Sequence, residues 1–279
     1  MSLLVQPRAT RSARSSGAAS WLRGIFGQSG SGPRYSVRIP DAELRRIGLL
    51  SQGHPDTSYT REEFRLIKRH IQSRTRVGAS AQGRDPNTIL VTSARPGEGK
   101  TFVALNLALS LAIERDVGVT LVDGDVSGRD LSRRFNLTSG RGLLDLLSGS
   151  AQLGDIVKDT NLGNLTFVPA GAQRPDAVEL LSSDRMSRLL SELAGRSANG
   201  VVVIDSGAVL SGSPAVALSA HAGQIVFVLS SNETHRTEIE ESLTILDSAA
   251  GPLEDANIGL VLNKTDSSQS PARYSADRN

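Results

Sequence analysis

The strongest constraint on the fold is a short glycine-rich loop that joins an apolar strand to a long apolar helix. The strand is predicted over Thr88–Ser93, where β-branched residues predominate, and the helix over Thr101–Arg115. Between them, Gly97 and Gly99 give the backbone access to angles that other residues rarely adopt. Such a loop can wrap so that its N–H groups point inward, and the positive end of the helix dipole adds to them. The stretch therefore predicts an anion-binding site at the start of the helix.

The loop sequence, ARPGEGKT, also matches the phosphate-binding pattern G-x-x-x-x-G-K-[ST], with Ala94 in place of the first glycine. In this pattern Lys100 brings a full positive charge to the β- and γ-phosphates, and the Thr101 hydroxyl ligates Mg²⁺. A glycine-rich turn without a ligand is the alternative, and the correctly spaced Lys-Thr pair argues against it. We therefore predict ATP and Mg²⁺ as cofactors. The residues predicted to contact the nucleotide are Pro96, Gly97, Glu98, Gly99, Lys100, Thr101 and Phe102.

Beyond the loop, apolar strands alternate with helical segments along the chain. Strands are predicted at residues 88–93, 117–122, 165–169, 201–205, 224–230 and 258–262. Helices are predicted at residues 101–115, 178–194, 214–220 and 233–247. Continuous apolar strands separated by helices predict an α/β fold with a mostly parallel sheet and helices on both faces. Right-handed crossovers then bring the carboxyl ends of the strands to one edge, where ligands bind.

Three aspartates lie at the predicted carboxyl ends of two strands. Asp123 and Asp125 end the first, in VTLVDGD, and Asp205 ends the second, in VVVID. Side-chain alternation directs Asp123 and Asp125 to the same side of the extended chain. Mg²⁺ needs only one or two direct carboxylates besides water. The site therefore has a surplus aspartate that could act as a base.

A charged helix is predicted to open the ordered domain. In YTREEFRLIKRHIQ, Thr60 and Glu63 have the spacing of a capping box, which predicts that the helix starts there. Phe64, Ile67 and Ile71 then share one face.

Composition limits the remaining possibilities. The chain of 279 residues has no cysteine, which excludes disulfides and thiolate metal sites. Its net charge is only +2 and its basic excess lies near the N-terminus, so no nucleic-acid ligand is expected. No apolar segment is long enough to span a bilayer, which predicts a cytoplasmic protein. We expect a basic, Ser/Gly/Arg-rich disordered tail at residues 1–56, a P-loop domain at 57–266 and a flexible tail at 267–279 containing Tyr274.

The order of the phosphate loop, VDGD and VVVID resembles the bacterial tyrosine kinases, which are P-loop kinases of exopolysaccharide and capsule assembly. The similarity spans about residues 57–266 and is closest to the soluble subfamily associated with exosortase systems. It includes EEFRLIKR, GLLDLL, VPAGAQRPDAVELLSSDRMSRLLSEL and GLVLNK. The resemblance implies a P-loop NTPase fold of the MinD/ParA type and ATP-dependent autophosphorylation on tyrosine.

The resemblance also implies roles for individual residues. Lys100, Asp123 and Asp125 would be catalytic, with Asp123 taking the proton of the attacking tyrosine. Asp125 and Asp205 would hold the metal together with the threonine of the phosphate loop. Asn263, in VLNK, would hydrogen-bond the adenine.

Oligomer formation and partners are implied in the same way. Glu62, Arg65 and Lys68 match the E-x-x-R-x-x-R helix motif, with lysine in the last position. That helix would pack against the neighbouring active site in a homo-oligomeric ring, so that Tyr274 of one subunit is phosphorylated by the next. A solvated charged face is the alternative for this helix. A membrane-bound chain-length determinant is the implied activator, and it would hold the kinase at the inner membrane.

Two departures leave other functions open. Tyr274 is the only tyrosine of the C-terminal tail, where the family usually has a run of tyrosines. After VVVI, the motif that contains Asp205 reads DSGA, where the family usually has Asp-Ser/Thr-Pro-Pro. One alternative is therefore a catalytically weak ATP-binding regulator of polysaccharide assembly. The other is an ATPase of the MinD/ParA group, whose members carry a second lysine where this chain has Arg95.

Overall fold

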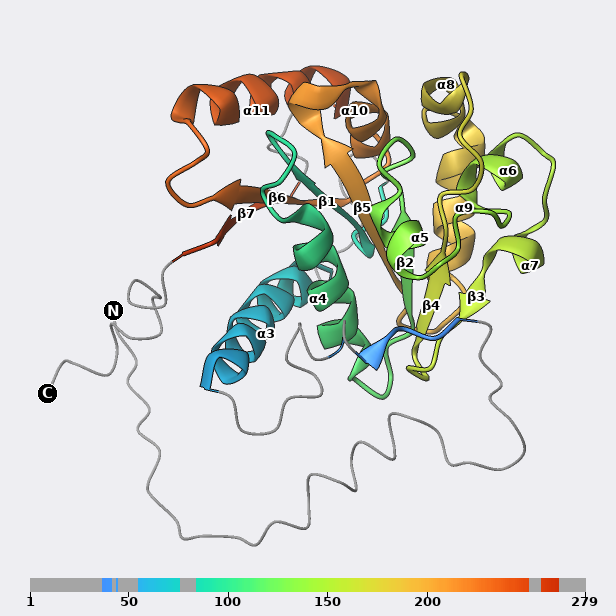
Figure 1. Cartoon of the computed structure of the whole chain (residues 1–279), viewed down its shortest axis with the longest axis horizontal. Helices are drawn as coiled ribbons and strands as arrows, with labels where there is room; N and C mark the ends of the chain where they lie inside the picture. Colours follow the sequence, from blue (N-terminus) through green and yellow to red (C-terminus); the bar gives the residue numbers. More distant parts are fainter. Residues whose placement is uncertain (1–36, 42–43, 45–54, 76–83, 251–256, 266–279) are drawn as a thin grey trace, which may run out of the picture.

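The computed structural model describes residues 37–41, 44, 55–75, 84–250 and 257–265. They form a seven-stranded sheet in the order β3-β4-β2-β5-β1-β6-β7 (Figure 1). The strands are β1 (Thr88–Ser93), β2 (Val119–Asp123), β3 (Lys158–Asp159), β4 (Leu165–Val168), β5 (Val201–Ala208), β6 (Gln224–Ser230) and β7 (Asn257–Asn263). All neighbours are parallel except the edge pair β3–β4. The predicted α/β class with a mostly parallel sheet is confirmed.

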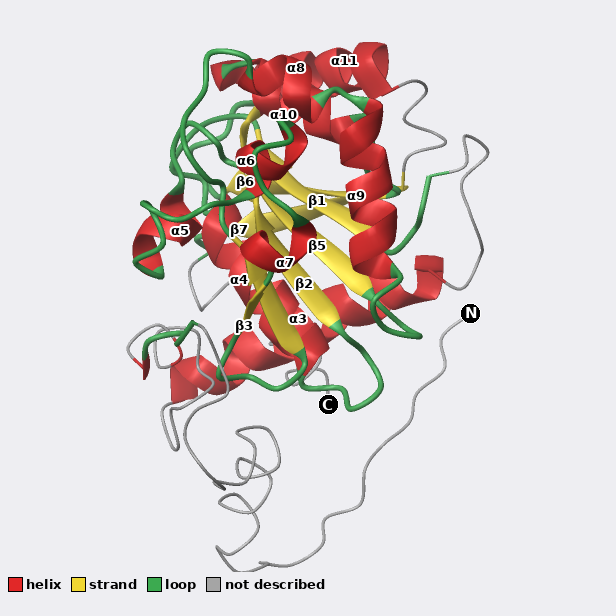
Figure 2. Ribbon diagram, turned by 90° about the vertical axis from the view of Figure 1, so that its right-hand side faces the viewer, coloured by secondary structure: helices red, strands yellow, loops and turns green. Residues whose placement is uncertain are grey.

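Helices cover both faces of this sheet (Figures 1 and 2). They are α3 (Pro55–Thr75), α4 (Lys100–Ala112), α5 (Asp130–Arg134), α6 (Leu143–Leu147), α7 (Leu153–Ile156), α8 (Ala177–Leu181), α9 (Asp184–Ala194), α10 (Ser213–Ser219) and α11 (Arg236–Ala250). Successive side chains of each strand point to opposite faces of the sheet, so each strand contributes to the apolar core on both faces. Ile89 and Val91 pack with α3 and α4, whereas Leu90 packs with α9 and α10 on the opposite face.

Helix α4 is apolar on nearly all sides because it lies between the sheet and α3. Ten of its 13 residues are buried, as expected for a helix without a solvent face. Its Phe102 ring meets Phe64 of α3 edge-on, with ring centroids 6.0 Å apart. The helix that starts at the phosphate loop is therefore held on both sides.

Two predicted helix boundaries are wrong. Helix α3 begins at Pro55, where proline is favoured in a first turn, so Thr60 lies inside the helix and does not cap it. The helix predicted over residues 178–194 is interrupted between α8 and α9. There the Ser183 hydroxyl donates to the Leu180 carbonyl, 2.6 Å away, and this local bond competes with a continuous helix.

Part of the segment predicted as an N-terminal tail packs on the domain. Val37 bridges to Thr160 in a parallel pairing, and the Ile39 N–H donates to the Asn161 side chain at 2.8 Å. Ile39 and Leu44 are fully buried in the core. Residues 1–36, 42–43 and 45–54, and the C-terminal residues 266–279 with Tyr274, lie outside the described residues. Within the described residues, no helix is long and apolar enough to cross a membrane.

Candidate active site

The glycine-rich loop lies between the end of β1 and the start of α4. Gly97 and Gly99 have φ angles of 85° and 102°, in the left-handed region that favours glycine. A side chain at Gly99 would collide with Asn263, since its Cβ would lie 2.0 Å from Nδ2. The predicted nucleotide-contacting residues 96–102 therefore form one turn that ends in the first turn of α4.

Lys100 lies at the end of the glycine-rich loop, as the first residue of α4, which is the position of a phosphate-binding lysine. It is only 9% exposed, and its Nζ donates to the Arg95 carbonyl across the loop at 3.5 Å. An ammonium group has three donors, and this contact is long. Lys100 therefore keeps donors for an anion bound in the loop.

Strand order brings two of the predicted aspartates together. Asp123 of β2 and Asp205 of β5 are directly paired in the parallel register, so their side chains leave the same face of the sheet. That face is the one covered by α4, because Leu121 and Val203, two residues earlier on each strand, pack in the α4 layer. Both carboxylates are fully buried.

Burial and mutual repulsion shape the electrostatics of this pair. Burial raises the pKa of Asp123 to about 6, although a hydrogen bond from the Ser132 hydroxyl opposes the rise. The two Ser132 donors, the backbone N–H and the hydroxyl, reach Asp123 Oδ2 at 2.8 and 2.6 Å. Burial also raises the pKa of Asp205 well above its usual value, and the Asp123 charge raises it further. The Thr101 hydroxyl, which lies near Asp205 without making a hydrogen bond of good geometry to it, and the Lys100 charge both oppose this rise. The pair is an electrostatic cost that a cation would relieve.

The unpaired oxygens of these carboxylates leave room for a divalent cation at Asp205 and for a proton at Asp123. Within the described residues, Asp123 Oδ1 and both oxygens of Asp205 are buried without a hydrogen-bond partner, an expensive arrangement for a carboxylate. No cluster of three or more His, Cys, Asp or Glu side chains there is arranged to hold a metal alone. Mg²⁺ typically takes one or two carboxylates and completes its shell with phosphate and water. The donor set thus suits Mg²⁺ bound together with a phosphate ligand.

Asp125 lies at the rim, in the turn that leaves β2. Its Oδ1 accepts the Gly128 N–H at 2.9 Å. A Cβ on Gly207 of β5 would lie 3.6 Å from this Oδ1, which places Asp125 beside the end of β5. The structure therefore gathers all three predicted aspartates at the carboxyl edge of β2 and β5.

Comparisons with known proteins point to one family. A ParA family model, described as NUBPL iron-transfer P-loop NTPase, matches residues 85–156. Tyrosine-protein kinase CpsD of Streptococcus agalactiae is 27% identical over 226 residues, which cover 81% of this chain and 92% of CpsD. The chain is thus similar, over most of its length, to the bacterial tyrosine-protein kinases that include CpsD.

Solved structures agree with this similarity. The chimerical protein CapA2B2 superposes with a TM-score of 0.66 at 26% identity, covering 82% of this chain and 93% of that one. The BceF tyrosine kinase domain gives a TM-score of 0.63 at 29% identity, with 79% and 86% covered. The narrower assignment to the exosortase-associated subfamily stays a prediction.

Four residues with roles implied by the resemblance make contacts within this chain. Asn263 Nδ2 donates to the Glu98 carbonyl at 2.9 Å, so this amide supports the phosphate loop, and its contact with adenine stays a prediction. Lys68 pairs with Glu114, just beyond the C-terminus of α4, at 2.8 Å, whereas Glu62 and Arg65 pair with each other on the exposed face of α3. Of the predicted interface residues, Glu62 and Arg65 are thus about half exposed and Lys68 is turned inward.

Ser132 is a site residue that no sequence motif marks. It lies in the short helix α5, nine residues beyond Asp123, and its hydroxyl also accepts the Ala170 N–H at 3.0 Å. Ser132 reaches Asp123 only because α5 packs against β2, and this packing cannot be read from the local sequence.

Proposed function

We propose that this chain is an ATP- and Mg²⁺-dependent protein-tyrosine kinase that autophosphorylates and regulates exopolysaccharide or capsule assembly. The observation that carries the proposal is the set of three unpaired carboxylate oxygens on Asp123 and Asp205, on the sheet face covered by α4. The name of CpsD, a tyrosine-protein kinase, supports the choice of acceptor. The spacing of the loop and the aspartates supports phosphoryl transfer over simple nucleotide storage.

The residues divide the work of transfer between them. Lys100 and the inward-facing loop amides bind the phosphates and neutralise charge that develops during transfer. Thr101, Asp125 and Asp205 are the residues that would hold Mg²⁺, which supplies further charge neutralisation when bound.

Asp123 is proposed to receive the proton of the acceptor. A pKa of about 6 leaves most of this carboxylate ionised at neutral pH, and Oδ1 has no donor among the described residues. A tyrosine hydroxyl has a pKa of ~10, so its proton moves to Oδ1 late in the reaction. By that point the phenol oxygen has largely formed its bond to the γ-phosphorus and the bond to the β–γ bridging oxygen has largely broken, and ADP leaves.

The acceptor and the assembly are also proposals. Tyr274 of a neighbouring copy is the proposed acceptor, and Glu62, Arg65 and Lys68 of α3 the proposed contact in a homo-oligomeric ring. A membrane-bound chain-length determinant is the proposed activator, which would hold the kinase at the inner membrane.

A labelling experiment tests the function. Purified protein is incubated with γ-labelled ATP and Mg²⁺, and label is counted on tyrosine and in free phosphate. The kinase predicts label on tyrosine, lost in Lys100→Met and Asp123→Asn and strongly reduced in Tyr274→Phe. Free phosphate without labelled protein would identify an ATPase, and intact ATP binding with neither product would identify a regulator.

A further inference from the structure

The phosphate loop contains a buried carboxylate that phosphate binding alone does not explain. Glu98 is only 3% exposed, although it lies in a loop that must accept a negatively charged triphosphate. Its Oε2 accepts the Arg95 N–H at 2.7 Å, so the side chain closes the loop on itself. A buried carboxylate at this position needs donors that satisfy it and direct its charge away from the phosphates.

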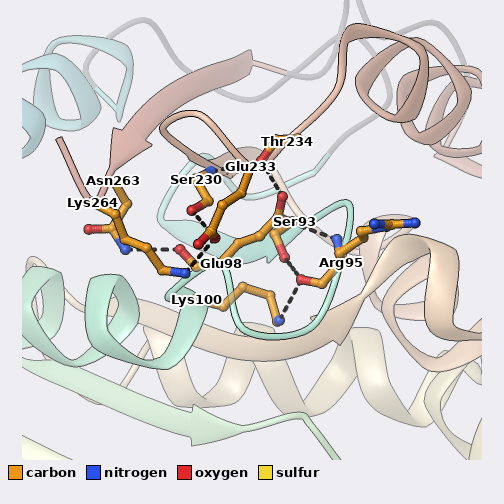
Figure 3. Close-up of polar contacts among 9 residues, drawn as sticks. All are labelled: Ser93, Arg95, Glu98, Lys100, Ser230, Glu233, Thr234, Asn263 and Lys264. Carbon is orange, nitrogen blue, oxygen red and sulfur yellow. Dashed lines mark hydrogen bonds and ion pairs between the residues drawn. The ribbon is translucent and has the colours of Figure 1, made fainter.

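The second donor comes from the turn between β6 and α11 (Figure 3). The Thr234 hydroxyl donates to Glu98 Oε1. The direction of this bond is settled by a neighbour, because the Ser230 N–H donates to Thr234 Oγ1 at 2.8 Å and an N–H cannot accept. The single hydroxyl proton of Thr234 is therefore committed to Glu98.

The first turn of α11 holds the loop at a second point. Glu238 Oε1 lies 2.8 Å from Arg95 Nε, and this glutamate is only 12% exposed. Its other oxygen accepts the His235 N–H at 3.0 Å, which fixes the side chain at the start of the helix. Arg95 and Glu98, on either side of Pro96 and Gly97, are thus each bound to the segment that leads from β6 into α11.

The turn itself is braced by polar contacts. Ser230 Oγ donates to Glu233 Oε2 at 2.5 Å, and Lys264 Nζ, just beyond β7, donates to the same oxygen at 2.6 Å (Figure 3). Asn232 adopts a left-handed φ of 63°, a conformation that costs free energy in a non-glycine residue. A strained, braced turn that contributes bonds to the phosphate loop has the properties of a rigid support.

We propose that Thr234 and Glu238 are positioning residues that hold the phosphate loop in its nucleotide-binding shape, Thr234 through Glu98 and Glu238 through Arg95. The proposal rests on the proposed function of the loop and adds two residues that no phosphate-binding motif includes. Neither residue needs to touch the nucleotide. Both act by keeping the loop amides directed inward and the Glu98 charge satisfied.

Calorimetric titration with Mg²⁺·ATP tests the proposal on the full chain. Thr234→Val removes the hydroxyl at nearly constant volume, and Kd should rise roughly tenfold, as for a lost hydrogen bond to a charged group. Thr234→Ser keeps the donor and should restore binding. Thr244→Val is the matched control, because among the described residues the Thr244 hydroxyl bonds only to the Glu240 carbonyl of its own helix, 2.8 Å away.

A kinetic readout separates positioning from general stability. Thr234→Val should raise KM for ATP more than it lowers kcat, and Thr244→Val should change neither. Glu238→Gln keeps its helix-capping oxygen but loses the ion pair, and it should raise Kd about two- to fivefold. It also provides the test if Thr234→Val does not fold.

Two results would overturn the inference. One is wild-type Kd in Thr234→Val or, should that variant not fold, in Glu238→Gln. The other is equal weakening in Thr234→Ser and Thr234→Val, because the retained hydroxyl would then have no effect. Absence of ATP binding in the wild-type chain would instead contradict the proposed function.

Discussion

Replacing Asp123 with asparagine should raise the free energy of unfolding while abolishing phosphoryl transfer to tyrosine. The pKa of Asp123 is about 6 in the folded chain because of burial, against 3.8 for an ordinary aspartate. Above pH 6 both folded and unfolded chains are ionised at this residue, and the folded chain carries the full cost of the buried charge. A shift of about two units corresponds to about 3 kcal/mol. This cost develops as pH rises from about 4 to 6, so wild-type stability falls over that range.

The Asp123→Asn variant would avoid this cost with little change in shape. The amide oxygen of the new side chain can accept both Ser132 donors, and its NH₂ group takes the place of the oxygen that lacks a partner. The neighbouring Asp205 also loses a repelling charge, which lowers its raised pKa. We therefore expect Asp123→Asn to exceed the wild type in free energy of unfolding by about 3 kcal/mol at pH 8. Near pH 4 the difference should fall below about 1 kcal/mol.

Urea unfolding at pH 8 and pH 4, at constant ionic strength and with EDTA, measures both differences. Asp116→Asn, at an exposed aspartate, gives the baseline for the loss of one negative charge. The labelling assay with γ-labelled ATP and Mg²⁺, on a separate aliquot of Asp123→Asn without EDTA or urea, should find no phosphotyrosine. The reasoning is refuted if Asp123→Asn is no more stable than the wild type at pH 8, or if its advantage is the same at both pH values.

Three further substitutions test separate parts of the structure. Gly99→Ala places a Cβ 2.0 Å from Asn263 Nδ2 at a φ of 102°, so calorimetry should find Mg²⁺·ATP binding lost; binding at the wild-type Kd would contradict the loop geometry. Phe167→Ala removes a fully buried ring that packs edge-on with Phe135 at 4.9 Å, and urea unfolding should record a loss of about 3–5 kcal/mol; a loss below about 1 kcal/mol would contradict this packing. Ser132→Ala removes a hydrogen bond that lowers the pKa of Asp123, so the acidic limb of the pH–rate profile should move to higher pH; an unmoved limb would mean that Asp123 is not the titrating base.

Much of the fold could be predicted because strands and helices have distinct apolar patterns. The strand predicted at residues 224–230 coincides with β6, and the α4 prediction is within three residues at its C-terminus. Local patterns failed where a single side chain or a proline decided a boundary. Pro55 starts α3 earlier than the apparent capping box at Thr60, and Ser183 interrupts the helix predicted over 178–194.

The candidate site was predictable in its parts and not in its contacts. The loop motif and the place of Asp123 and Asp205 directly after apolar runs are local features, although β5 continues past Asp205 to Ala208. The direct pairing of the two aspartates depends on β5 lying between β2 and β1. Strand order is a property of the whole sheet, and no local pattern encodes it. The same holds for Thr234, which reaches Glu98 across 136 positions of sequence.

Titration of the purified chain with ATP, in the presence and absence of Mg²⁺, tests the central claim most directly. The account predicts measurable heat of binding with Mg²⁺, much weaker binding in EDTA, and loss of binding in Lys100→Met. It is contradicted if the folded wild-type chain takes up no ATP in the presence of Mg²⁺, or if Lys100→Met binds with the wild-type Kd.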